Sequence, residues 1–259
     1  MNMLLLFDIG NTHTHLGLAD RKRVVKQTNI PTAKWFAGGA EKLVLKFIGR
    51  AVVEGTALCS VVPRATPIAC AMVRRRWHLD CLELTPKTLR GVGIDYPRPK
   101  SIGPDRLANA VAVARHYGKP AVVVDFGTAV TFDVVDRAGN YVGGIIAPGL
   151  AAMTEYLHEK TALLPRIKIR AEKAVIGKNT AQAMLIGAVH GYRGLIRGLI
   201  AELKQHLRAK RLPVVATGGY ARLIAAEMPE ITAIEPSLTL EGLRLVWESR
   251  NVAARRVAK

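Results

Sequence analysis

Two short segments of the sequence share a pattern that suits phosphate binding. The first is Asp8-Ile9-Gly10-Asn11-Thr12, and the second, 117 residues later (125 − 8), is Asp125-Phe126-Gly127-Thr128. Glycine lets backbone N–H groups approach an anion, threonine adds a hydroxyl donor, and aspartate can bind a cation or its hydration shell. One such turn alone is typical of an ordinary β-hairpin. Two matched copies favour a site for a nucleotide with its metal ion.

A second feature with possible chemistry is the pair Asp105 and Arg106, at the start of a helix predicted by the small and apolar residues of 107–117. Phosphoryl transfer to an alcohol needs a carboxylate within hydrogen-bond reach of the hydroxyl, and arginine can hold a carboxylate or a phosphate. An acidic residue is also favourable at any helix N-terminus. The residues alone leave both interpretations open.

The elements that would position these residues form a repeated pattern. Each half opens with three short strands joined by turns, and strands and helices then alternate, which is typical of βαβ units. Lys119-Pro120 interrupts the chain before the second set begins. We therefore expect two domains, 1–117 and 118–259. The predicted strands are 3–8, 12–18, 23–27, 57–62, 79–84, 121–124, 130–135, 141–146 and 214–216, and the helices are 40–48, 66–76, 107–117, 150–159, 180–207, 220–226 and 240–248.

Composition narrows the class of protein. A chain of 259 residues with 49% hydrophobic content can bury a substantial core. No stretch approaches the roughly 20 apolar residues of a membrane helix, and no signal peptide opens the sequence, so we expect a cytoplasmic protein without membrane contact. The three cysteines, Cys59, Cys70 and Cys81, lack the close pairing of zinc or redox motifs. They are interpreted as reduced core thiols.

The charge is unusual, because 38 Lys and Arg against 20 Asp and Glu give +18. An excess of this size is compatible with an anionic substrate, nucleic acid or a basic-leaning proteome. The basic residues fall in scattered clusters, and aromatic residues do not alternate with them as they do in single-strand binders. Nucleic acid is therefore the weaker alternative.

Several motifs, taken in order, resemble the signatures of type III pantothenate kinases, and together they span essentially the whole chain. The resemblance implies the acetate-kinase, sugar-kinase and actin superfamily, and hence an α/β fold of two ribonuclease-H-like (actin-like ATPase) domains with a nucleotide cleft between them. The segments that carry the resemblance are 8–18, Gly103-Pro104-Asp105-Arg106, 125–131, 143–149, 161–165, Ile176-Gly177-Lys178-Asn179-Thr180, Thr217-Gly218-Gly219 and 238–243.

The resemblance also implies an activity and the residues that carry it. The reaction would be ATP-dependent phosphorylation of pantothenate, the first step of coenzyme A biosynthesis, by a homodimeric transferase. Asp105 would be the general base, with Mg²⁺ near Asp8 and a monovalent cation, K⁺ or NH₄⁺, at Asp125. ATP would be bound by Asp8, Ile9, Gly10, Asn11, Thr12, His13, Thr14, His15 and Thr128. Pantothenate would be bound by Tyr96, Gly103, Pro104, Asp105, Arg106 and Thr180, the last from the partner subunit.

Two positions depart from the family pattern. His13 and His15 share one face of a strand, but two side chains are too few for a metal site, and solvent-facing imidazoles are expected. Pro104 replaces a small residue and also fits a helix start. Without the resemblance, Thr180 would be interpreted as a helix N-cap.

Two rival functions stay open. Because fold does not fix function, a regulatory or nucleic-acid-binding protein on the same scaffold is possible, and the +18 charge supports it. The nearer rival is a kinase of another small hydroxy acid.

Overall fold

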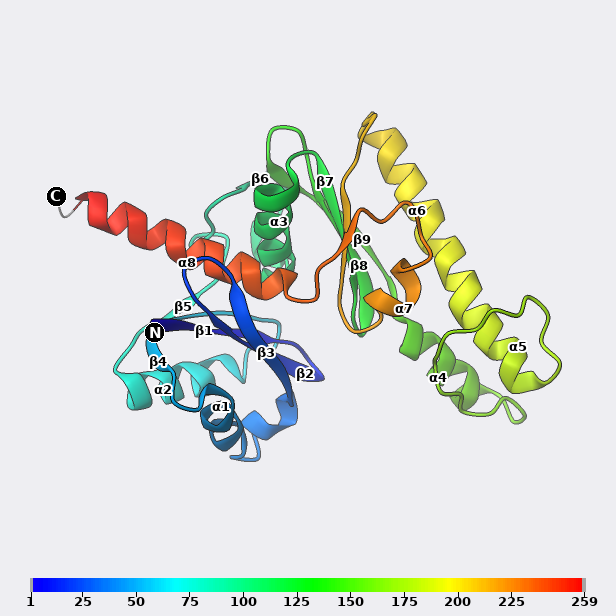
Figure 1. The fold of residues 1–259 in the computed structure, drawn as a ribbon, viewed down its shortest axis with the longest axis horizontal. Coiled ribbons are helices and arrows are strands. Elements are labelled where there is room, and N and C mark those ends of the chain that lie inside the picture. The colour runs from blue at the N-terminus through cyan, green and yellow to red at the C-terminus, as the bar shows by residue number, and fades with distance from the viewer. Residues whose placement is uncertain (1, 258–259) are drawn as a thin grey trace. The chain divides into compact units, whose positions relative to one another are not determined.

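The computed structural model describes residues 2–257, with side chains through residue 250. The chain forms two compact units, one of Met1–His116 with Ser237–Lys259 and one of Tyr117–Pro236 (Figure 1). The expected division, 1–117 and 118–259, differs from these units in the C-terminal segment. This segment belongs with the first unit although it is last in the sequence.

The first unit is built on one sheet. Its strands have the order β3-β2-β1-β4-β5, in which β1 is antiparallel to β2 and parallel to β4. The elements of this unit are β1 (Asn2–Ile9), β2 (His13–Ala19), β3 (Val24–Pro31), the 3₁₀ turn η1 (Thr32–Trp35), α1 (Ala40–Ile48), β4 (Val52–Ser60), α2 (Thr66–Trp77), β5 (Cys81–Glu83), β6 (Gly93–Ile94), η2 (Pro99–Ser101), α3 (Pro104–Tyr117) and α8 (Leu238–Val257).

The two faces of this sheet are covered by different helices, because successive side chains of a strand point to opposite faces. Leu5, Phe7 and Ile9 of β1 lie in the core formed with α1 and α2. Helix α8 packs against β1 to β4 and lies on the side opposite α1 and α2 (Figure 1). Asp8 lies between Phe7 and Ile9 in β1, so its side chain points to the second face. Helix α8 therefore covers the face that carries this carboxylate.

Glycines let α8 pack closely on its neighbours in the first unit. A Cβ atom at Gly55 of β4 would overlap the ring of Trp247, and a Cβ atom at Gly242 would overlap the backbone carbonyl of Ala108 in α3. The buried hydroxyl of Thr239 also donates to Asn109 Oδ1 at 2.8 Å. Helix α8 therefore joins α3 to the first unit, which explains the difference from the expected domain boundary.

The second unit repeats the same plan. Its strands have the order β11-β10-β7-β8-β9, in which β7 is antiparallel to β8 and parallel to β10. The elements are β7 (Ala121–Phe126), β8 (Ala129–Val135), β9 (Asn140–Pro148), α4 (Leu150–Lys160), α5 (Thr180–Ile186), the π-helical turn η3 (Gly187–Gly191), α6 (Tyr192–His206), β10 (Val214–Thr217), α7 (Ala221–Ala225) and β11 (Ala233–Ile234).

The core of the second unit lies between its sheet and the helices α6 and α7. Val122, Val124 and Phe126 alternate along β7 and pack with Tyr192 of α6 and Ile224 of α7. The two units thus share one strand order around a central parallel pair, β1–β4 in the first and β7–β10 in the second. The predicted fold class, two ribonuclease-H-like α/β domains, is confirmed.

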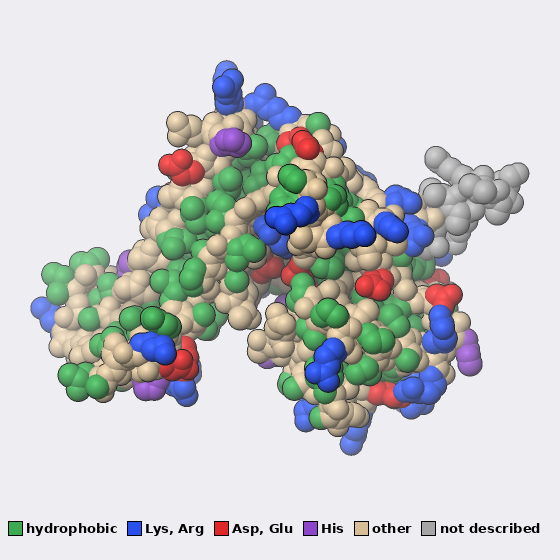
Figure 2. All heavy atoms as spheres, turned by 180° about the vertical axis from the view of Figure 1, so that it is seen from behind, with side chains coloured by type: hydrophobic (Ala, Val, Ile, Leu, Met, Phe, Trp, Pro, Cys, Tyr) green, Lys and Arg blue, Asp and Glu red, His purple; other side chains and the backbone are tan. Residues whose placement is uncertain are grey.

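The surface carries its basic residues in small groups. On the face of the described residues shown in Figure 2, Lys and Arg side chains are dispersed among acidic and apolar ones rather than gathered in one stripe. Several are paired, among them Arg75 and Arg76, both with Glu41. Among residues 2–257, none of the helices combines the length and apolar character needed to span a bilayer.

Candidate active site

The first turn predicted to bind phosphate lies between β1 and β2, at the end of the central strand. Gly10 N donates to His13 O at 3.0 Å and closes the turn, and Thr32 Oγ1 donates to Gly10 O at 2.7 Å. Asn11 and Thr12, at the tip, are exposed. These hydrogen bonds fix the base of the turn, and its tip residues face solvent, as a phosphate-binding loop requires.

Two residues predicted to bind ATP in this turn have side chains that face the core. Ile9 is fully buried, and so is Thr14, whose hydroxyl lies 3.0 Å from Thr32 Oγ1 and accepts a hydrogen bond from Trp35 Nε1 at 3.0 Å. These side chains hold the turn in place. A ligand could contact Ile9 and Thr14 only through their backbone.

The Asp8 carboxylate lies between residues of the two neighbouring strands. Asp8 is in register with His15 of β2 and with Cys59 of β4. The Cys59 thiol donates to Asp8 Oδ1 at 3.4 Å, and His15 Nδ1 lies 3.6 Å from Asp8 Oδ2. Burial, with a smaller effect of the charge of His13, lowers the pKa of His15. His13 is exposed as expected, but His15 is partly buried beside Asp8.

Asp105 stands in the first turn of α3. Its Oδ1 accepts a hydrogen bond from Arg106 N at 2.9 Å, and a Cβ atom at Gly103 would come within 2.5 Å of the same oxygen. Burial raises the pKa of Asp105, and the Arg106 backbone and charge only partly oppose this. A carboxylate with a raised pKa is a stronger base than an exposed aspartate.

The buried thiol of Cys59 lies beside Asp8 in the first unit. Its pKa lies well above the usual range, first because the side chain is fully buried and then because the carboxylates of Asp8 and Asp105 act on it. Both carboxylates therefore lie near enough to the sulfur to disfavour a thiolate. Asp8, Cys59 and Asp105 all belong to the first unit.

The second turn is also closed by a glycine N–H, but it is one residue shorter than the first. Gly127 N donates to Ala129 O at 3.0 Å, and Thr128 at its tip is exposed. Asp125 is in register with Thr131 of β8 and Thr217 of β10. Gly218 has a φ of +91°, and a Cβ atom there would come within 2.5 Å of Asp125 Oδ1. The backbone after β10 thus closes over this carboxylate.

Two predicted substrate residues lie outside these turns. Tyr96 follows β6 and is 37% exposed. Thr180 is the exposed first residue of α5, and the N-cap is Asn179, whose Oδ1 accepts a hydrogen bond from Gln182 N at 2.9 Å. Interpreting Thr180 as the cap is therefore wrong. Its hydroxyl is not needed for that role.

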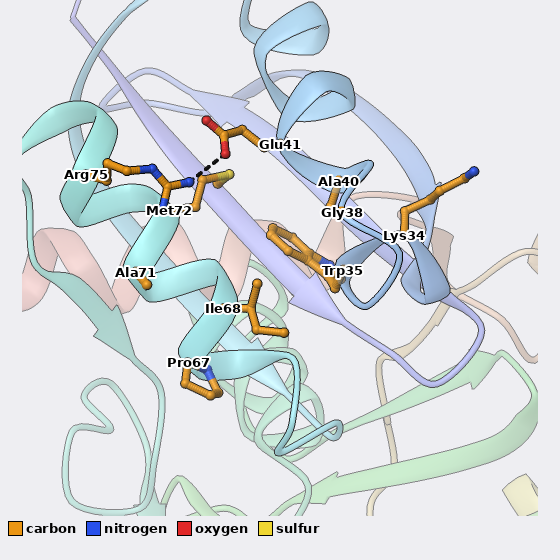
Figure 3. Close-up of a pocket in the computed structure, with 10 residues that line it drawn as sticks. All are labelled: Lys34, Trp35, Gly38, Ala40, Glu41, Pro67, Ile68, Ala71, Met72 and Arg75. Carbon is orange, nitrogen blue, oxygen red and sulfur yellow. Dashed lines mark hydrogen bonds and ion pairs between the residues drawn. The ribbon is translucent and has the colours of Figure 1, made fainter.

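A separate pocket of about 470 Å³ opens between η1, the start of α1 and α2 (Figure 3). It is lined by Trp35, Ile68 and Met72, with the Glu41–Arg75 ion pair at its side. It contains none of the predicted site residues. Among the described residues, no three His, Cys, Asp or Glu side chains are placed to hold a metal ion.

Comparison with known proteins identifies the family of this chain. The sequence model of the family described as Type III pantothenate kinase matches residues 4–202. The chain belongs to the type III pantothenate kinase family. A type III pantothenate kinase of Methylacidiphilum infernorum is 43% identical over 247 residues, which cover 95% of this chain and 88% of the relative. That of Akkermansia muciniphila is 44% identical over 242 residues, or 93% and 96% of the two chains.

Solved structures agree at the level of fold. A Campylobacter jejuni protein described as a conserved candidate transcriptional activator of the Baf family matches this type III pantothenate kinase family member with a TM-score of 0.61. The sequence identity is 18%, and 95% of this chain and 98% of that chain are covered. A likeness at this identity establishes the shared fold and carries nothing about activity.

One residue of the site was not found from the sequence of this family member. Cys59 was interpreted as a core thiol, and it is indeed buried, but it also contacts Asp8. The available signal was its place at the end of a strand parallel to β1. The register that sets it opposite Asp8 depends on strand pairing between residues 51 positions apart.

Proposed function

We propose that this member of the family transfers the γ-phosphoryl group of ATP to the primary hydroxyl of pantothenate, giving 4′-phosphopantothenate at the first step of coenzyme A biosynthesis. Family membership supports the reaction. The observation that carries the proposal is the desolvated carboxylate of Asp105 in the first turn of α3, directly before Arg106. A base and a turn that binds the nucleotide are the parts that phosphoryl transfer to an alcohol needs.

In this proposal Asp105 takes the proton of the pantothenate hydroxyl as the phosphoryl group is transferred. Arg106 follows it on α3 and would pair with the substrate carboxylate or the transferring phosphoryl group. Gly103 and Pro104 would shape the loop before the helix, and Tyr96 would contact the substrate. The raised pKa of Asp105 supports the role of base, because a stronger base accepts the proton more readily.

ATP would be bound through the turn after β1. Gly10, Asn11, Thr12 and His13 would contact the phosphates with backbone N–H groups or exposed side chains, and Thr128 of the second turn would add a further contact. Mg²⁺ keeps several waters and takes phosphate oxygens, so it needs few protein ligands. The Asp8 side chain, an oxygen donor that is 17% exposed, fits this need. Bound Mg²⁺ would neutralise the phosphate charge.

A monovalent cation, K⁺ or NH₄⁺, is proposed at Asp125. Such a cation needs oxygen ligands, and the carboxylate sits at the end of β7 where Gly218 lets the backbone approach. A side chain at position 218 would fill the space beside Oδ1. The added positive charge would offset that of the polyphosphate.

A homodimer is proposed in which Thr180 contributes to the substrate site of the partner. One end of the second unit, made by β9, α4 and the segment before α5, exposes apolar side chains, and Figure 2 shows apolar side chains gathered there. Patches of this kind mark protein interfaces. We call this surface the apolar end; it contains Ile146, Met153, Tyr156, Leu157, Leu163, Val175 and Ile176.

The rival functions predict different behaviour. A nucleic-acid-binding protein would shift DNA in a gel and lose that binding steeply with salt, because phosphate contacts release counterions. On the face shown in Figure 2 the basic residues are dispersed, which gives that alternative little support. A cytoplasmic location stays a prediction.

A coupled ATPase assay tests the proposal, with pantothenate compared with a panel of other small hydroxy acids and alcohols. We expect ADP release that depends on pantothenate. Release that depends instead on another hydroxy acid would support the nearer rival.

A further inference from the structure

One oxygen of the Asp8 carboxylate accepts a hydrogen bond from inside the protein. Cys59 is fully buried, in register with Asp8 on the parallel neighbour β4, and its thiol donates to Oδ1 at 3.4 Å. Oδ2 lies on the side of His15, whose side chain is 36% exposed. Oδ1 thus lies on the side of β4 and Oδ2 on the side of β2.

The second unit has a comparable residue at the same position. Thr217 is on the parallel neighbour of β7, in register with Asp125, and it is 3% exposed. Cysteine and threonine differ in shape and polarity, but each carries a hydrogen-bond donor at the end of its side chain. In each unit, a buried side chain that can donate a hydrogen bond therefore lies opposite the aspartate that precedes the predicted phosphate-binding turn. A purely apolar packing role would not favour threonine at this position.

We infer that Cys59 is a positioning residue for the divalent cation: its thiol fixes Asp8 Oδ1 so that the carboxylate keeps one orientation toward the magnesium ion of bound Mg·ATP. The inference rests on the proposed function, because it takes Asp8 as the residue next to that ion. Partners of metal-facing carboxylates are worth about 10–100-fold in metal affinity. The weak S–H donor belongs at the lower end of this range.

The test compares Cys59→Ala, which removes the donor, with Cys59→Ser, which keeps one. Cys70→Ala is the matched control, since Cys70 is a half-buried cysteine of α2 in the same unit. Isothermal titration calorimetry gives the Kd of ATP with Mg²⁺ and with excess chelator, and thermal melts confirm that each variant is folded. The quantity of interest is the ratio of the two Kd values, because a general packing defect would weaken both.

We expect Cys59→Ala to reduce the Mg²⁺ advantage in ATP binding by about tenfold, with the Kd of metal-free ATP nearly unchanged. Cys59→Ser should recover most of that loss, and Cys70→Ala should behave as wild type. An unchanged Mg²⁺ advantage in Cys59→Ala would overturn the inference, and so would equal losses in the Ser and Ala variants. Because this measurement uses no pantothenate, failure of the proposed reaction would be seen separately, as normal Mg·ATP binding without phosphorylation.

Discussion

Asp8 and Asp125 occupy equivalent positions in the two sheets. Each is the next-to-last residue of a central strand, and each faces one residue of its hairpin partner and one of its parallel neighbour. For Asp8 these residues are His15 and Cys59, and for Asp125 they are Thr131 and Thr217. The carboxylates thus share a backbone position but have different surroundings.

The first prediction concerns the cation at Asp125. We expect turnover of ATP with pantothenate to require K⁺ or NH₄⁺, and Asp125→Asn to lose most of this activation because the amide carries no charge. Initial rates in Tris buffer with and without added KCl measure the effect, with choline chloride as the control for ionic strength. Equal wild-type rates in all three buffers would contradict the assignment.

The second prediction concerns the apolar end of the second unit. Leu163 is 89% exposed, and Leu163→Glu should place charges in the proposed dimer interface, so the protein should become monomeric and lose most of its activity. Val52→Glu is the control, because Val52 is 60% exposed in the first unit. Light scattering gives the mass of each variant. A wild-type monomer with full activity would argue against the dimer and against a role for the partner's Thr180.

The third prediction concerns the packing of α8 on α3. Gly242→Ala should destabilise the fold by about 1–3 kcal/mol, since the new methyl group overlaps the Ala108 backbone. Gly194→Ala in α6 is the matched control, because nothing lies within 4 Å of its added Cβ atom, and it should stabilise by up to about 1 kcal/mol through helix propensity. Urea unfolding curves measure both. Similar stabilities for the two variants would show that α8 tolerates a wider separation from α3.

The sequence predicted the local parts of this fold well. Hairpin turns such as Asp8 to Thr12 are determined by residues close together in the chain, so the repeated three-strand pattern was visible before the structure. The place of α8 was not, because it depends on contacts such as Thr239 with Asn109, which are 130 positions apart. The same limit applies within the turn, where strand register alone decides that Thr14 faces the core and His15 lies beside Asp8.

The fourth prediction concerns pH. Burial raises the pKa of Asp105, and the carboxylate must be ionised to act as a base. The value of kcat/KM should therefore be highest above that pKa and fall as the pH drops through it. This fall should occur at a higher pH than it would for an exposed aspartate, whose pKa is about 3.9. The pH profile of kcat/KM for wild type measures this. An acid limb at the ordinary aspartate value would show that Asp105 is not the desolvated base.

The same shift has a consequence for stability with the opposite sign. A raised pKa means that the folded state disfavours the ionised form, so stability decreases as the pH rises from the unfolded pKa through the folded pKa. Asp105→Asn removes this cost. Its Tm at neutral pH should therefore equal or exceed that of wild type, and the difference should shrink in acid.

The reaction itself gives the most direct test of Asp105 as the base in ATP-dependent phosphorylation of pantothenate. Purified wild-type protein and Asp105→Asn would be incubated with Mg·ATP, KCl and pantothenate, and phosphopantothenate would be quantified by mass spectrometry over time. We predict product with wild type, and a kcat lower by about 10²–10⁴-fold in the variant with nearly unchanged ATP binding. No product from folded wild-type protein, or a kcat near the wild-type value in Asp105→Asn, would contradict the account.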